Sequence, residues 1–253
     1  MLKILISNDD GVEAKGLQYL YDALKGIANV FVIAPDKNQS GAGSSITTKR
    51  PLKTQDFKEN FLSVNGTPAD CVFLGLNGLC PFEPDLVVSG INAGANMGED
   101  LLYSGTIGAA MEGRNTRLPC IAFSSAYKKE LDQEILPNYL SAALIAKKLI
   151  KNINSLSINP SVTLNVNVPN LAFKDLKGIK NTVLGSWGPR NPPSIEVKKS
   201  GEKRFWITHR DKHSNNHSNT DIETLSKGYV SVTPVHPNFL DVGDSNLISW
   251  LQI

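Results

Sequence analysis

Residues 1–36, MLKILISNDDGVEAKGLQYLYDALKGIANVFVIAPD, contain the pattern that decides the fold. A short apolar run at Ile4–Ile6 is followed by apolar residues at helical spacing between Leu17 and Ile27, and then by a second run at Val30–Ala34. Apolar residues three and four positions apart share one face of a helix, whereas short continuous apolar runs are typical of buried strands. The order strand, helix, strand therefore predicts a βαβ unit with two parallel strands.

The same alternation continues to about residue 169. Further strands are expected at Phe61–Val64, Asp85–Ser89, Pro119–Ser124 and Val162–Val168, and helices at Pro68–Leu76, Thr106–Asn115 and Tyr139–Ile150. Strands that are apolar throughout indicate a parallel sheet whose two faces are both covered. The expected fold class is α/β, with helices on both faces of the sheet.

The sequence pattern changes at Pro169, from alternating strands and helices to a more polar, β-like pattern. We therefore expect a catalytic core at residues 1–169 and a C-terminal extension at residues 170–253. The extension is expected to contain a β-hairpin formed by Ile195–Lys198 and Arg204–Thr208, a helix at Asp221–Ser226, a strand at Tyr229–Thr233 and a closing helix at Asp244–Leu251. The extension is more polar than the core strands, and we expect it to stay outside the main sheet. Its large apolar residues need a partner surface, either a second subunit or the protein's own active-site edge: Trp187, Phe205, Trp206, Ile207 and Tyr229.

Composition excludes several classes of function. The 253 residues include 26 Lys plus Arg and 24 Asp plus Glu, so a formal net charge of +2 supplies no extended basic face for duplex nucleic acid. No apolar stretch approaches the length of a membrane span, and we expect a cytoplasmic protein. The three cysteines show no C-x-x-C spacing, and His213 and His217 lie in an Asn- and Ser-rich stretch that favours a solvated loop over a zinc site.

Three of the expected strands end in unusually polar segments. These are Ser7–Gly11, Ala34–Asp36 with its continuation to Ser45, and Ser89–Asn96. In an open parallel sheet, ligands bind outside the carboxyl ends of the strands, so all three segments should lie on one edge. The glycines between Gly41 and Ser45 do not form a dinucleotide fingerprint, and we interpret that segment as a flexible loop near the site.

Asp9 and Asp10 are adjacent carboxylates at the end of the first strand. Two such groups repel each other unless a cation lies beside them, and the neighbouring segments offer hydroxyl and amide oxygens but no His or Cys. An all-oxygen donor set favours Mg²⁺ or Mn²⁺ over Zn²⁺. The alternative is that Asp10-Gly11 forms a turn and Asp9 caps a helix.

Ser104-Gly105-Thr106 begins an expected helix in which Gly108, Ala109 and Ala110 allow close approach of the backbone. The free N–H groups of such a helix start can hold a phosphate. The alternative is that Ser104 or Thr106 only caps the helix.

Six motifs in order give the chain a family resemblance. They are Asn8-Asp9-Asp10-Gly11, Ala34-Pro35-Asp36 leading to Ser40, Gly66-Thr67-Pro68-Ala69-Asp70-Cys71-Val72, Ser89-Gly90-Ile91-Asn92, Tyr103-Ser104-Gly105-Thr106 and Gly228-Tyr229-Val230-Ser231-Val232-Thr233-Pro234. With these motifs the chain resembles the SurE survival-protein nucleotidases. The chain departs from the family pattern at residues 186–219, where Pro192-Pro193 and a Ser200-Gly201 hairpin replace an Asp-Pro-Arg-Gly-type turn.

The resemblance implies a metal-dependent phosphatase of nucleoside 5′- and 3′-monophosphates, acting also on short polyphosphate, with a Rossmann-like core and a C-terminal oligomerising extension. By motif position, one divalent ion per subunit would be held by Asp9, Asp10, Ser40 and Asn92, with Asp9 and Asp10 catalytic. Asn96, Ser104, Gly105 and Thr106 would face the phosphate. The resemblance also points to a homodimer or homotetramer.

Two alternatives stay open at the level of sequence. Asp9 or Asp10 could act as a covalent nucleophile, although aspartyl-phosphate phosphatases typically separate two aspartates by one residue. The chain could also be a nucleotide-binding sensor that uses the metal and phosphate segments without turnover, because ligand residues alone bind as well as catalyse.

Overall fold

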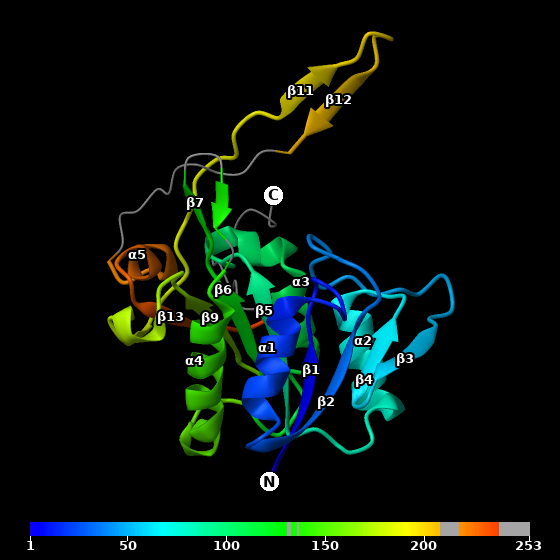
Figure 1. Ribbon diagram of the computed structural model, residues 1–253, viewed down its shortest axis with the longest axis vertical. Coiled ribbons are helices and arrows are strands. Elements are labelled where there is room, and N and C mark those ends of the chain that lie inside the picture. The colour runs from blue at the N-terminus through cyan, green and yellow to red at the C-terminus, as the bar shows by residue number, and fades with distance from the viewer. Residues whose placement is uncertain (131–132, 136, 208–217, 238–253) are drawn as a thin grey trace, which may run out of the picture.

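The computed structural model describes residues 1–130, 133–135, 137–207 and 218–237, and is built on one nine-stranded sheet (Figure 1). The strand order is β10-β13-β9-β6-β5-β1-β2-β4-β3. The central strands are mutually parallel: β1 (Leu2–Ser7), β2 (Ala28–Pro35), β4 (Phe61–Val64), β5 (Leu86–Ala93), β6 (Ile121–Ser125) and β9 (Thr163–Val168). The expected α/β class with a Rossmann-like parallel sheet is confirmed.

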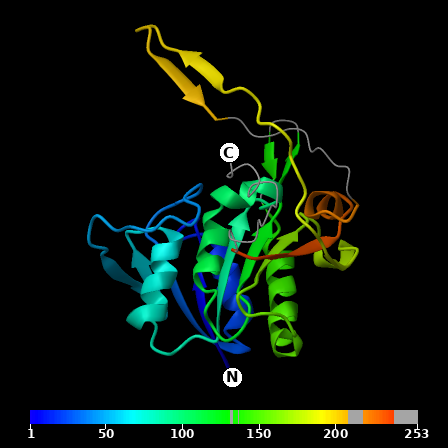
Figure 2. The same ribbon diagram turned by 180° about the vertical axis from the view of Figure 1, so that it is seen from behind.

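Two pairs of helices cover the two faces of the sheet. Helices α1 (Lys15–Leu24) and α4 (Tyr139–Lys151) lie in front of the sheet in Figure 1, and α2 (Pro68–Leu74) and α3 (Gly105–Glu112) come to the front in Figure 2. Ile4 and Ile6 of β1 pack with the α1 side, whereas Leu5 packs with the α2 side. Alternate residues of a strand point to opposite faces, so continuous apolar strands supply both cores at once.

The expectation that the segment after Pro169 stays out of the main sheet is wrong. Strand β13 (Val230–Val235) pairs antiparallel with β9, and β10 (Ile179–Asn181) pairs parallel with β13. Ser231 and Thr233 are as fully buried in β13 as Val230 is, so part of the strand's buried surface is polar and gave no apolar signal in the sequence. The other edge strand, β3 (Thr54–Lys58), is exposed along its whole length, and its sequence therefore carried no apolar signal.

The expected hairpin is confirmed as an arm that reaches away from the body of the molecule (Figures 1 and 2). It consists of β11 (Ser194–Val197) and β12 (Lys203–Trp206), and α5 (Asp221–Ser226) follows it in the chain. The remaining elements are the hairpin β7 (Lys128–Glu130) and β8 (Gln133–Ile135), and the short helices η1 (Gly75–Leu79), η2 (Gly98–Tyr103), η3 (Ile153–Ser155) and η4 (Phe173–Asp175).

Some sequence predictions lie outside the described residues, namely the closing helix at Asp244–Leu251 and the His213 and His217 stretch. In the part of the chain that the structure describes, no helix combines the length and the apolar character needed to cross a membrane.

Candidate functional site

The polar segments predicted to share one edge do lie together at the carboxyl ends of the strands. A cavity of about 530 Å³ opens there. Five of the predicted site residues line it, from four different segments: Asp9, Ser40, Asn92, Asn96 and Ser104. The arm leaves the body on this same side, and the N-terminus lies on the opposite side (Figure 1).

Asp9 lies at the N-terminus of α3. Its carboxylate accepts a hydrogen bond of 2.6 Å from the Thr106 hydroxyl and further hydrogen bonds from the backbone N–H groups of Gly105 and Thr106. Gly105 permits this approach, because a Cβ there would lie 2.8 Å from the Asp9 Cβ. Burial raises the pKa of Asp9 above its ordinary value, although these donors act in the opposite direction.

Asp10 is partly buried beside Asp9 and accepts a hydrogen bond of 3.2 Å from the backbone N–H of Ala93. Burial, and secondly the charge of Asp9, raise the pKa of Asp10 to about 6. Burial and the charge of Asp10 also raise the pKa of Tyr139, to about 12. The apo site therefore holds more negative charge than its surroundings stabilise, which is the condition that a bound cation relieves.

The other two predicted metal ligands supply neutral oxygens. Asn92 donates its side-chain N–H to the Gly94 carbonyl at 2.9 Å, and Ser40 is an exposed residue at the rim of the same cavity. Among the described residues, no three His, Cys, Asp or Glu side chains gather closely enough to hold a metal. The donors at this edge are thus two carboxylates with hydroxyl and amide groups, a set that fits Mg²⁺ or Mn²⁺.

The segment interpreted as a flexible loop is packed against α3. The backbone N–H of Gly43 donates to the Tyr103 carbonyl at 3.1 Å. A Cβ at Gly108 would lie 2.3 Å from the Gly43 carbonyl oxygen, so the small residues of α3 accommodate this loop. The sequence predicted that Gly108 allows close approach of the backbone, and its contact with Gly43 confirms this.

The start of α3 shows the capping role that was weighed for it in the sequence. Ser104 is the N-cap, because its Oγ accepts a hydrogen bond of 3.2 Å from the backbone N–H of Ile107, and it also lines the cavity. Thr106 is fully buried, and its hydroxyl is directed at Asp9. The structure therefore brings Gly105 and Thr106 to Asp9, and their contact with a phosphate stays a prediction.

Asn96 is held in the cavity wall by buried polar side chains of β6 and β9. Its backbone N–H donates to the Asn167 side chain at 2.8 Å, and its carbonyl accepts from the amides of Asn165 and Asn167. Its own amide donates to the Ser124 hydroxyl at 2.9 Å. These four hydrogen bonds fix Asn96 in place, and no local sequence pattern indicated them.

One wall of the cavity was not assembled from the sequence. It is formed by Tyr103 of η2, Tyr127, and the residues Trp187 and Arg190 of the segment that leads from β10 to the arm. Tyr103 belongs to the Tyr103–Thr106 motif quoted above, and Trp187 is one of the apolar residues for which a partner surface was expected. The contribution of residues 186–190 could not be read, because they lie more than eighty residues from η2 in the chain.

Asp221 fastens this wall to the fold. Its buried carboxylate accepts hydrogen bonds from the backbone N–H groups of Gly98 at 2.9 Å, Gly185 at 2.7 Å and Ile222 at 2.9 Å. Glu99 adds a second link, because it accepts from the Ser186 hydroxyl at 2.5 Å and from the backbone N–H of Trp187 at 2.9 Å. The two carboxylates thus tie η2 to the segment before the arm.

We expect Asp221→Ala to lower the free energy of unfolding by about 2–4 kcal/mol, because it leaves three buried N–H groups without their acceptor. The cost of burying the carboxylate, which raises the pKa of Asp221, offsets part of that loss. Urea unfolding measures the change, with the exposed Asp175→Ala as the matched control. Equal stabilities for the two variants would contradict this role.

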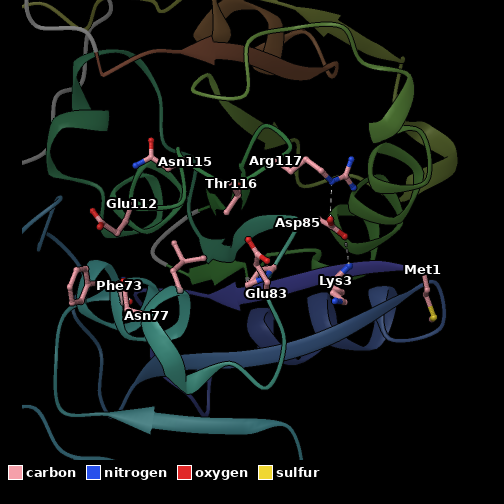
Figure 3. Close-up of a pocket in the computed structure, with 12 residues that line it drawn as sticks. Met1, Lys3, Phe73, Asn77, Glu83, Asp85, Glu112, Asn115, Thr116 and Arg117 are labelled. Atoms are coloured by element: carbon pink, nitrogen blue, oxygen red, sulfur yellow. Dashed lines mark hydrogen bonds and ion pairs between the residues drawn. The ribbon is translucent and has the colours of Figure 1, made fainter.

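A larger cavity of about 800 Å³ lies at the amino-terminal edge of the sheet (Figure 3). There Asp85 accepts hydrogen bonds from the Arg117 side chain at 2.9 Å and from the backbone N–H of Lys3 at 2.9 Å. It contains none of the predicted site residues. Since parallel sheets bind ligands at the opposite edge, the smaller cavity is the candidate site.

Comparisons with known proteins agree with this geometry. The family model described as "Survival protein SurE" matches residues 4–191. The chain is 46% identical to a protein of Pseudomonas putida (strain W619) and 45% identical to one of Pseudomonas fluorescens (strain Pf0-1), each over 253 residues that cover 99% of both chains, and both are named 5′-nucleotidase SurE. A crystal structure of the SurE protein from Aquifex aeolicus superposes with a TM-score of 0.84 at 37% identity, again covering 99% of each chain. With its ordered motifs, its parallel sheet and these full-length matches, the chain belongs to the SurE survival-protein family.

Proposed function

We propose that the protein is a divalent-metal-dependent phosphatase that hydrolyses nucleoside 5′- and 3′-monophosphates, and also short polyphosphate. The observation that carries the proposal is the adjacent pair Asp9 and Asp10 at the carboxyl end of β1, where Asp9 lines a cavity together with Ser40 and Asn92. Burial raises the pKa of both carboxyl groups. Relatives that match nearly the whole chain are named 5′-nucleotidase, which supports the same activity. A cytoplasmic location and the absence of duplex nucleic acid as a partner stay predictions.

One Mg²⁺ or Mn²⁺ per subunit would be held by Asp9, Asp10, Ser40 and Asn92. When bound, such an ion polarises a phosphate and lowers the pKa of a water that attacks phosphorus. Thr106 orients the Asp9 carboxylate through the 2.6 Å hydrogen bond. Ser104 accepts from the Ile107 N–H and so keeps its hydroxyl proton for a phosphate oxygen, and Asn96 faces the same cavity. Ser104 and Asn96 would then be fixed donors that stabilise the equatorial oxygens of the phosphate as negative charge builds on them in the transition state.

The experiment that tests this proposal is release of inorganic phosphate from AMP and GMP, in the 5′ and 3′ forms, with Mn²⁺, Mg²⁺ or EDTA. Metal-dependent release that EDTA abolishes is the expected result. Binding of the nucleotides without any release would favour the sensor alternative. A phosphoenzyme trapped on either aspartate would favour the covalent alternative.

The arm supports a homodimer or homotetramer. Several large apolar side chains of its two strands and the residue after them are exposed: Ile195, Val197, Phe205, Trp206 and Ile207. A two-stranded hairpin is marginal alone in water, so these side chains need a second surface. Because the arm points away from its own body in Figures 1 and 2, a second copy of the chain fits better than a lid over its own site.

Deletion of residues 194–208 is expected to yield smaller particles by light scattering, with metal binding retained because none of the proposed ligands lies there. The double substitution Ile195→Ser with Phe205→Ser, at a cross-strand pair, should act in the same direction while keeping the hairpin. Substitution of the exposed Lys203 in the same hairpin by Ser is the control. An unchanged mass per particle with an altered KM would instead favour the lid.

A further inference from the structure

The cavity is lined by residues that the proposed phosphate chemistry does not use. Besides the polar residues Asp9, Asn96 and Ser104, it has an aromatic wall. The Tyr103 and Tyr127 side chains in this wall are large and apolar, yet 51% and 46% exposed. Aromatic rings left open in a cavity that also holds the polar groups of a reaction are typical of a binding surface for a flat ligand group.

Tyr103 and Arg190 form a stacked pair within this wall. The guanidinium carbon of Arg190 lies over the Tyr103 ring, 4.9 Å from its centre. Arg190 also makes an ion pair of 3.2 Å with Asp100, which helps to hold the guanidinium over the ring. The pair offers a flat face for stacking and several N–H donors for ring or carbonyl acceptors.

The pair is fixed before any ligand binds. Trp187, three residues before Arg190, donates its indole N–H to the Met97 carbonyl at 2.9 Å and its backbone N–H to Glu99 at 2.9 Å. The Asp221 carboxylate accepts hydrogen bonds from the backbone N–H groups of Gly98 and Gly185, and so holds η2 against the segment that contains Trp187. A preorganised wall binds a ligand without first having to order its own side chains.

We propose that Tyr103 and Arg190 form the subsite for the base of a nucleoside monophosphate, which deepens and rests on the proposed function. Tyr103 directly precedes Ser104, the N-cap that lines the same cavity, so one ligand can reach both groups. An aromatic base stacks on the face of the tyrosine ring that Arg190 leaves open, as bases do on other proteins, while the guanidinium holds the ring from its opposite face. An aliphatic phosphomonoester gains no such stacking. This wall therefore selects nucleotides over sugar phosphates.

The test compares AMP with ribose 5-phosphate, which lacks only the base, for the wild type, Tyr103→Leu, Tyr103→Phe and Arg190→Gln. Tyr103→Leu is expected to raise KM for AMP about tenfold, equivalent to about 1.4 kcal/mol, with kcat unchanged and kcat/KM for ribose 5-phosphate within twofold of the wild type. Tyr103→Phe keeps the ring and should raise KM for AMP by much less than Tyr103→Leu does. Arg190→Gln should shift KM for AMP in the same direction by less. Phe57→Leu, an exposed aromatic on the distant edge strand β3, is the control.

A second readout does not depend on turnover. By calorimetry, the wild type should bind adenosine, ribose should not bind, and Tyr103→Leu should weaken adenosine binding about tenfold. Equal losses for AMP and ribose 5-phosphate, or adenosine binding no tighter than that of ribose, would overturn the subsite while leaving a phosphatase. A wild type that binds adenosine through Tyr103 but releases no phosphate would support the subsite and contradict the proposed function.

Discussion

Asp9→Asn and Asp10→Asn are each expected to abolish metal-dependent phosphate release while the fold is retained. Each substitution removes one of two charges whose main partner would be the cation, and the neutral amide is a much weaker ligand for Mg²⁺ or Mn²⁺. Phosphate release from AMP with Mn²⁺, together with the circular dichroism spectrum, measures both parts. Asp22→Asn, an exposed aspartate that pairs with Lys25 on α1, is the matched control and should keep full activity. Activity within a few-fold of the wild type for either site variant would contradict the metal assignment.

The Asp10→Asn protein should also be more stable than the wild type in EDTA. A metal ligand is expected to show this gain in stability, whereas a residue that stabilises the fold would show a loss. The folded state raises the pKa of Asp10 from 3.8 to about 6, so at pH 7 the ionised group destabilises the metal-free fold. Relief of that cost is expected to add on the order of 1–3 kcal/mol to the free energy of unfolding. The gain should shrink as the pH falls below about 6 and vanish by about pH 3, where the carboxyl is protonated in folded and unfolded chains alike. A loss of stability at pH 7 would contradict the argument from repulsion.

Thr106→Val is expected to lower kcat by about 10- to 100-fold with a smaller change in KM, the size of effect seen when the hydrogen-bond partner of a metal ligand is removed. The buried hydroxyl orients Asp9 at 2.6 Å, and valine keeps the shape but leaves that carboxylate oxygen without its donor. Ser104→Ala should lower kcat in the same sense, and it also removes the cap of α3, so its melting temperature must be measured in parallel.

Thr163→Val provides the control for the Thr106 experiment. Thr163 is a fully buried threonine on β9 whose hydroxyl has no hydrogen-bond partner among the described residues, so valine removes nothing that is paired. Its kcat should match that of the wild type. An unchanged kcat for Thr106→Val, with only a loss of stability, would reduce Thr106 to a packing residue.

The sequence by itself determined the elements of the core and the position of the acidic pair. Residues 1–36 were enough to predict β1, α1 and β2, because a buried strand and an amphipathic helix each impose a local periodicity on the chain. Asp9 and Asp10 could be placed in a site because the carboxyl ends of parallel strands meet at one edge, whatever the details of packing. The same reasoning placed four further residues at this cavity: Ser40, Asn92, Asn96 and Ser104.

Only the tertiary structure decided what surrounds those residues. The hydrogen bond from the Thr106 hydroxyl to Asp9 could not be read from the sequence, because the depth at which α3 packs on the sheet is set by contacts between segments and not by the helix's own sequence. The Tyr103 and Arg190 pair and the Asp221 carboxylate escaped prediction because each joins segments far apart in the chain. The same holds for β13, whose place beside β9 depends on a pairing that the strand's own residues do not specify. Local periodicity records which face of an element is buried, whereas hydrogen bonds and stacking between distant residues arise only once the chain has folded.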